Sequence, residues 1–298
     1  MAQKLTAPAI AARKVRRGSE PLVMVTAYDA PGARMVSEAG ADLILVGDSL
    51  AMVVLGYEDT MQVTIDDMAH HTAAVARAKP DCFIVADLPW LSYHVSPSET
   101  VNNAARLIRA GAHAVKLEGG LERIRMVEAI IEAEIPVMGH LGLTPQSVLA
   151  MGGFKVQGKS SNAAMRIQTQ AKALAHAGCF AIVLEGVPNE VGRLVTDSVD
   201  IPTIGIGAGP DCDGQVLVFH DVLGIEDRFK PKFVRRYGSL KQDGVEALAH
   251  FAADVRTGAF PADEECYHLS GEEAEALGLY GSPVTPQTNH GEDQLGIW

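Results

Sequence analysis

Four acidic side chains stand where short apolar runs end, and they are the residues best placed to do chemistry. The runs are LILVGDS, FIVADLP, AVKLEG and AIVLEG, with the acids Asp48, Asp87, Glu118 and Glu185. Runs of Val, Ile and Leu without polar alternation are typical of strands buried on both faces of a parallel sheet. Because parallel strands end at one common edge, three acids could hold a hard divalent cation and a fourth could act as a base.

Three of these acids also have a simpler interpretation. Asp48 and Asp87 follow or end strands, where Asp often shapes a turn or caps a helix. Lys116 and Glu118 lie two residues apart in one strand, so they share a face, and a Lys inside a buried strand needs a partner. A structural ion pair is the alternative there. Glu185 ends its strand in the same way and suits a general base.

His140 is the histidine most relevant to a site. It follows a short predicted strand, PVMG, and precedes LGLTPQS, which places it at the same edge as the acids. We therefore expect it to touch substrate. His70 and His71 lie within a helical stretch that lacks the H-E-x-x-H spacing, and they are more typical of surface or packing residues.

The elements that would position these residues alternate along the chain. Strands are predicted at 22–27, 42–46, 83–87, 112–117, 136–138, 180–184, 202–206 and 214–218. Helices are predicted at 31–39, 64–78, 97–109, 121–133, 163–177 and 189–198. Eight strands with intervening helices predict an α/β fold, a (β/α)8 TIM barrel whose active site lies where the strands end. An open doubly wound sheet is the alternative.

Both ends of the chain lie outside this rhythm. The basic segment before Glu20 could be a transit peptide, but Thr6 and Pro8 form a helix start, so residues 6–17 are predicted as a short helix packed on the core. From 271 on there are five acids and no Lys or Arg, which predicts a mobile tail. We therefore expect one barrel domain over 1–270 and an acidic tail over 271–298.

Composition excludes several classes of partner. The net charge is −12, and no basic run interleaved with aromatic residues could follow a phosphate backbone, so nucleic acid is not an expected partner. No apolar run approaches the roughly 20 residues needed to cross a membrane. The four cysteines are far apart and form no C-x-x-C pair, which favours a reducing cytoplasm.

A series of longer motifs carries a family resemblance. The motifs are TAYDAPGA, LVGDSLAMVVLGY, TIDDMAHHTAAV, ADLPW, GAHAVKLEGG, PVMGHLGLTPQS, GGFKVQGK, VLEGVP and IGIGAGPDCDGQVLVFHD. In order and spacing, from about Tyr28 to Gly224, they resemble the 3-methyl-2-oxobutanoate hydroxymethyltransferases, which are also called ketopantoate hydroxymethyltransferases. The resemblance implies a barrel of the phosphoenolpyruvate/pyruvate superfamily, a bound Mg²⁺, the first committed step of pantothenate synthesis, and a homodecamer of two pentameric rings.

The resemblance also implies roles for single residues. Asp48 and Asp87 match metal-coordinating aspartates, and Glu118 matches a further acid of the metal site that acts through water. Substrate-binding positions are matched by Ser49, Asp87, Lys116 and His140, and the general base by Glu185.

The implied reaction transfers a hydroxymethyl group from the co-substrate 5,10-methylenetetrahydrofolate to 3-methyl-2-oxobutanoate, which gives 2-dehydropantoate. Two alternatives remain at this point. A superfamily lyase or mutase would use the same barrel and metal without folate, although GHLGLTPQS and GGFKVQGK speak against it. A non-catalytic barrel would be expected to lack one of the acids or Lys116, and this sequence has them all.

Overall fold

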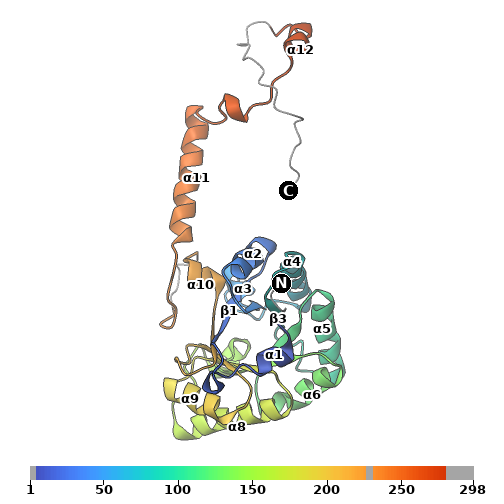
Figure 1. Ribbon diagram of the computed structural model, residues 1–298, viewed down its shortest axis with the longest axis vertical. Helices are drawn as coiled ribbons and strands as arrows, with labels where there is room; N and C mark the ends of the chain where they lie inside the picture. The colour runs from blue at the N-terminus through green and yellow to red at the C-terminus, as the bar shows by residue number, and fades with distance from the viewer. Residues whose placement is uncertain (1–4, 226–230, 280–298) are drawn as a thin grey trace. The chain divides into compact units, whose positions relative to one another are not determined.

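The predicted barrel is confirmed by a computed structural model, which describes residues 5–225 and 231–279. Eight parallel strands close a barrel in chain order. Figure 1 shows the barrel and its surrounding helices in the lower part of the view. The strands are β1 (Leu22–Thr26), β2 (Leu43–Val46), β3 (Phe83–Asp87), β4 (Ala114–Glu118), β5 (Val137–Gly142), β6 (Ala181–Glu185), β7 (Thr203–Ile206) and β8 (Gly214–Leu217).

The helices of the barrel layer are α2 (Ala30–Glu38), α3 (Leu50–Val53), α4 (Ile65–Arg77), α5 (Pro97–Arg109), α6 (Ile124–Glu132), α7 (Val148–Met151), α8 (Ser161–His176), α9 (Asn189–Ser198) and α10 (Phe219–Leu223). Four of these helices around the strands, α2, α4, α5 and α8, begin at a side-chain cap that the sequence supplies. Ser96 accepts a hydrogen bond from the Glu99 N–H, and Thr64 and Asp67 form a reciprocal capping box.

The interior of the barrel is apolar toward the end at which the strands begin. Inward-facing side chains from alternate strand positions, such as Leu22, Leu43, Phe83 and Met138, form one buried cluster. Ile10 of helix α1 (Ala7–Ala11) is completely buried in the same cluster. The first helix therefore closes the end of the barrel at which the strands begin.

The predicted helix over 6–17 is wrong in its length. Helix α1 begins at the N-cap Thr6 as expected but ends at Ala11, and a separate 3-10 helix follows at Val15–Arg17. The break places Lys14 in the interior, where Nζ lies 2.6 Å from Asp213 Oδ2 and donates to the Thr196 carbonyl at 3.0 Å. The helix does not continue past Ala11 because this buried ion pair anchors the segment around Lys14.

The fifth strand is longer than predicted. It continues to Gly142, so His140 lies within β5 and not after it. Glycine at 139 reads as the end of a strand in the sequence, but here it serves close packing. A Cβ on Gly139 would lie 2.9 Å from Leu174 Cδ1 of α8, so glycine lets this helix approach the strand.

The chain divides into two units, one ending at Lys241 and the other beginning at Gln242. Helix α11 (Leu240–Thr257) crosses this boundary and was not among the predicted helices, and α12 (Gly271–Ala276) lies within the predicted tail. Residues 280–298 of that tail lie outside the described residues. The domain boundary predicted at 270 stays a prediction. Over the described residues, no helix is both long and apolar enough to cross a membrane.

Candidate active site at the barrel mouth

The polar side chains of the site occupy the same inward-facing strand positions as the apolar interior, further along each strand. Residues two apart in a strand share a face, so the inward series Phe83, Val85 in β3 continues to Asp87. The same alternation carries Ala114 to Lys116 and Glu118 in β4, Met138 to His140 in β5, and Val183 to Glu185 in β6. We call the ends of the strands at which these residues gather the barrel mouth.

Parallel pairing sets which of these side chains are neighbours. Asp87 pairs with Lys116, and Glu118 pairs with His140, so adjacent strands present them at equal heights. Lys116 Nζ lies 2.9 Å from Asp87 Oδ1. The Nδ1 atom of His140 lies 3.2 Å from Lys116 Nζ and 3.4 Å from Glu118 Oε1. A continuous row of charged groups results.

Glu185 joins this row through the other ring nitrogen of His140, whose Nε2 lies 3.3 Å from Glu185 Oε2. Glu185 is the more open of the two acids, with 17% of its side chain exposed, against 3% for Glu118. The most solvent-accessible acid of the row is therefore the one predicted to be the base.

Asp48 and Ser49 enter the mouth from the loop after β2. The backbone N–H of Asp48 donates to Asp87 Oδ2 at 3.1 Å, which brings the two predicted metal acids together. Ser49 Oγ lies 2.9 Å from the hydroxyl oxygen of Tyr28. A Cβ on Gly47 would lie 2.9 Å from Ser49 Oγ and 3.6 Å from Asp87 Oδ2, so this hydroxyl and carboxylate flank the same glycine.

The excess of acids governs proton affinities in the mouth. Burial raises the pKa of the Asp48 carboxyl well above its usual range, and the charges of Asp87 and Glu118 raise it further. For Lys116, burial acts to lower the pKa, but the charges of Asp87, Glu118 and Asp48 outweigh it and raise the pKa. The site therefore favours added positive charge.

His140 is subject to the same balance. Burial and the charge of Lys116 act to lower its pKa, but hydrogen bonding to Glu118 and Glu185 outweighs them and raises the pKa to about 9. A protonated imidazole thus lies between two carboxylates near neutral pH.

Two buried residues of the mouth carried no predicted role. Gln146, in the loop after β5, donates from Nε2 to Asp48 Oδ2 at 2.8 Å, and Tyr93, in the loop after β3, donates from its hydroxyl to Gln146 Oε1 at 2.6 Å. Gln146 belongs to the motif GHLGLTPQS, but a single amide in a loop has no strand register to place it. Only the folded loops bring it to Asp48.

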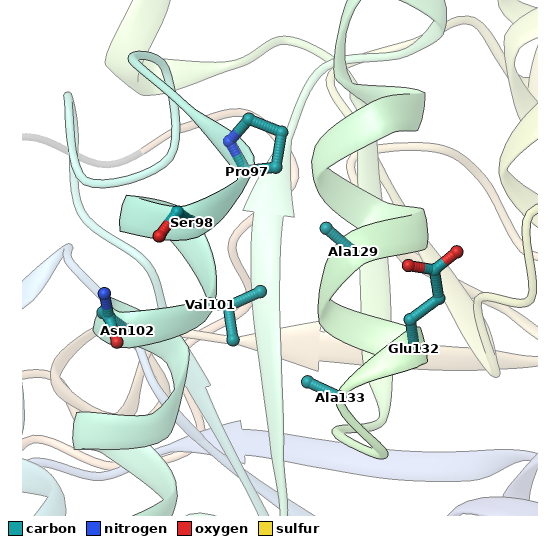
Figure 2. Close-up of a pocket in the computed structure, with 7 residues that line it drawn as sticks. All are labelled: Pro97, Ser98, Val101, Asn102, Ala129, Glu132 and Ala133. Carbon is teal, nitrogen blue, oxygen red and sulfur yellow. The ribbon is translucent and has the colours of Figure 1, made fainter.

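A shallow hollow also lies outside the barrel, between α5 and α6. Figure 2 shows it lined by Pro97, Ser98, Val101, Asn102, Ala129, Glu132 and Ala133. Glu132 is its only charged lining residue, and none of the residues of the mouth contributes to it. The hollow is separate from the candidate active site.

Comparison with known proteins identifies the family. The ketopantoate hydroxymethyltransferase profile matches residues 4–263. The chain is 53% identical over 267 residues to 3-methyl-2-oxobutanoate hydroxymethyltransferase 2 of Bradyrhizobium diazoefficiens, with 90% of each chain covered. It is 54% identical over 270 residues to the 3-methyl-2-oxobutanoate hydroxymethyltransferase of Moorella thermoacetica, which covers 90% of this chain and all of the relative.

Solved structures agree on the fold. A 2,3-dimethylmalate lyase, a member of the PEP mutase/isocitrate lyase superfamily, matches with a TM-score of 0.53 at 16% identity and covers 92% of this chain and 95% of its own. This likeness supports the barrel, whereas the sequence relatives above support the family. The chain matches the family profile and these relatives over most of its length, and its barrel has charged side chains at the mouth. It belongs to the ketopantoate hydroxymethyltransferase family.

Proposed function

We propose that this protein transfers a hydroxymethyl group from 5,10-methylenetetrahydrofolate to 3-methyl-2-oxobutanoate, giving 2-dehydropantoate for pantothenate and coenzyme A synthesis. The observation that carries the proposal is the continuous row Asp87, Lys116, His140 and Glu185 at the barrel mouth, in a chain whose relatives bear this enzyme's name. A base, a fixed cation and paired acids are what proton abstraction next to a carbonyl requires.

The acids of the mouth fit a magnesium ion. Asp48, Asp87 and Glu118 are all at least 95% buried. Burial, and then the charges of Asp87 and Glu118, raise the pKa of Asp48, so a cation would relieve an electrostatic cost already present. In the described ranges, no group of three or more His, Cys, Asp or Glu side chains is arranged so that it could hold a metal ion by itself. Mg²⁺ commonly uses one or two carboxylates, with water and substrate as its other ligands. We assign Asp48 and Asp87 as direct ligands and Glu118 as an acid acting through water.

When bound, Mg²⁺ supplies Lewis-acid polarisation of the substrate's keto group. Ser49 and Lys116 bind the carboxylate and keto oxygens, and Lys116 neutralises the charge that grows there as the proton leaves. Glu185 removes the proton from C3, and His140 orients the Glu185 carboxylate through the contact at Nε2 and lines the pocket. Asp87 contributes to substrate binding by holding the ammonium of Lys116 in place.

The bonds balance over the whole reaction. The C3–H bond breaks, and its electron pair forms a C–C bond to the methylene carbon of the folate. Both C–N bonds of that carbon, to N5 and N10, break, and the two nitrogens take up the proton from C3 and one proton of a water molecule. Water provides the hydroxyl group, and tetrahydrofolate and 2-dehydropantoate leave. None of these steps needs an oxidant or a reductant.

We further propose a homo-oligomer, a decamer by family resemblance, acting in the cytoplasm. Helix α11 leaves Val245, Leu248, Phe251 and Val255 half-exposed or more, and this spacing lets apolar side chains share a helix face that could contact another chain. The cysteines of the described residues are all free, which suits a reducing compartment.

The deciding experiment is hydrogen exchange at C3 of 3-methyl-2-oxobutanoate, measured by NMR in deuterated water with Mg²⁺ and without folate. Wild-type protein should replace the C3 hydrogen by deuterium. Glu185→Gln keeps the side chain's shape but cannot accept the proton, so exchange and turnover should fall ~10²–10⁴-fold. Exchange at the wild-type rate in Glu185→Gln would show that another group is the base.

The alternative of a folate-independent lyase or mutase is not favoured. Proteins with such names match this chain in fold at under 20% identity, whereas the relatives above 50% identity are hydroxymethyltransferases. Product analysis checks the choice directly. The proposed reaction forms 2-dehydropantoate only when 5,10-methylenetetrahydrofolate is present.

A further inference from the structure

Gln146 connects two acids that come from different parts of the barrel. Its side-chain Nε2 donates to Asp48 Oδ2 at 2.8 Å and to the Leu88 carbonyl at 3.0 Å. Its backbone N–H donates to Glu118 Oε2 at 3.0 Å. One residue of the loop after β5 therefore holds one oxygen of an acid after β2 and one oxygen of an acid in β4.

The orientation of the Gln146 amide is determined by its neighbours. The Tyr93 hydroxyl accepts the Glu118 backbone N–H at 3.3 Å, and it donates its own proton to Gln146 Oε1 at 2.6 Å. The two partners of Nε2, a carboxylate and a backbone carbonyl, are both acceptors. A reversed amide would place oxygen against oxygen at Asp48 and Leu88, so only the observed orientation satisfies every group.

The network also determines which carboxylate oxygens make no hydrogen bond and remain available as ligands. Asp48 uses Oδ2 toward Gln146, and among the described residues its Oδ1 makes no hydrogen bond. Tyr93 and Gln146 are buried, at 1% and 4% exposure, so water does not compete for these bonds. In a polar network this dry, loss of one member leaves the others with unsatisfied groups.

We propose that Gln146 is a positioning residue, held by Tyr93, that fixes the orientation of the Asp48 and Glu118 carboxylates for a divalent cation. This inference rests on the proposed function, because it takes these acids as the magnesium site. Neither Gln146 nor Tyr93 needs to touch the cation. They act by limiting the rotation of the acids that do.

The test uses two substitutions that remove the network and keep the volume. Gln146→Met retains the length of the side chain and the backbone bond to Glu118, but it loses the bonds to Asp48, Leu88 and Tyr93. Tyr93→Phe retains the buried ring and loses only the hydroxyl. Loss of groups that orient metal ligands typically weakens metal affinity 10–100-fold, so we expect the Kd for Mg²⁺ to rise ~10–100-fold in Gln146→Met and about 10-fold in Tyr93→Phe.

Thr196→Val is the matched control for a general loss of stability. Thr196 is also buried, and its hydroxyl donates to the Gly192 carbonyl and lies 2.7 Å from Thr203 Oγ1, at the opposite end of the barrel. Its substitution should lower the Tm and leave the Kd for Mg²⁺ unchanged. Calorimetric titration with Mg²⁺ and thermal unfolding of all four proteins give the two readouts.

Activity measurements separate an effect on Mg²⁺ binding from an effect on kcat. The Mg²⁺ concentration for half-maximal turnover should rise in Gln146→Met and Tyr93→Phe, and kcat at saturating Mg²⁺ should fall less than activity at limiting Mg²⁺. The double variant should lose less than the product of the two single effects, because Tyr93 acts through Gln146.

Wild-type Mg²⁺ affinity in folded Gln146→Met or folded Tyr93→Phe would overturn the inference. Equal weakening in Thr196→Val would also overturn it, because the effect would then follow stability. If wild-type protein exchanges the C3 hydrogen and binds Mg²⁺ while these variants do the same, only the positioning role fails. Absence of Mg²⁺ binding in wild-type protein would overturn the proposed metal site and this inference together.

Discussion

The ammonium group of Lys116 lies 2.9 Å from Oδ1 of Asp87, and both side chains are about 95% buried. Asp48 has no such cation at this distance among the described residues; its carboxylate is held by the neutral amide of Gln146. The two predicted metal-binding aspartates therefore stand in unequal surroundings. Asp87 is already balanced by a cation, whereas Asp48 bears most of the repulsion in the mouth.

Asp48→Asn and Asp87→Asn should consequently affect stability in opposite directions. Burial and neighbouring acids raise the pKa of Asp48, so the folded state loses stability as the pH rises above the ordinary value of 3.8, and the cost is complete above the raised pKa; an amide removes this cost. Asp87→Asn leaves Lys116 buried without its partner, which should cost about 3–5 kcal/mol. Denaturant unfolding in EDTA at neutral pH measures both effects.

Mg²⁺ binding should fall in both aspartate variants, since each loses an anionic ligand. Calorimetry showing wild-type affinity in either one would contradict the assignment of that residue. A less stable Asp48→Asn protein in EDTA would contradict the electrostatic argument.

His140 should make stability depend on pH in the alkaline range. Its folded pKa of about 9 lies above the unfolded value of 6.5, so its contribution is complete below pH 6.5 and is lost as the pH rises through 9. In EDTA, the difference in unfolding free energy between wild type and His140→Gln should shrink by on the order of 3 kcal/mol between pH 6 and pH 10.

His94 supplies the control for this measurement. Burial and the nearby Arg123 lower its pKa to about 4, so its charge changes only at acid pH. Between pH 7.5 and pH 10 the stability difference between wild type and His94→Gln should stay constant, while that of His140→Gln should shrink. Parallel curves for the two variants would refute the raised pKa of His140.

Lys14 should be important for stability, although it lies far from the mouth in sequence and in the fold. Lys14→Met would leave Asp213 buried and unpaired and should cost about 3–5 kcal/mol. Arg17, which pairs with the exposed Asp200, is the control, and Arg17→Gln should cost under about 1 kcal/mol. Similar unfolding free energies for the two variants would contradict an anchoring role for Lys14.

The decamer can be checked by mass alone. Light scattering of the purified protein at micromolar concentration should give about ten times the 31.6 kDa of one chain. Truncation before α11 should lower the measured mass of the assembly if the exposed apolar side chains of this helix form a subunit contact. A monodisperse monomer of the full chain would exclude the decamer.

The sequence by itself determined the barrel and the set of charged residues at its mouth. Strand periodicity is two, so the side on which Lys116 and Glu118 lie follows from their spacing alone. The ends of buried parallel strands meet at one edge, and this places Asp87 and Glu185 in a common site without knowledge of any loop. Local rules of this kind need no long-range contact.

Tertiary structure decided what each group touches. The extension of β5 to include His140 depends on the packing of Gly139 against Leu174, and the break after Ala11 depends on a partner for Lys14 nearly two hundred residues away. The amide of Gln146 reaches Asp48 because loops after different strands converge. Such contacts have no periodic signature, since the residues are distant in the chain and only the closed barrel brings them together.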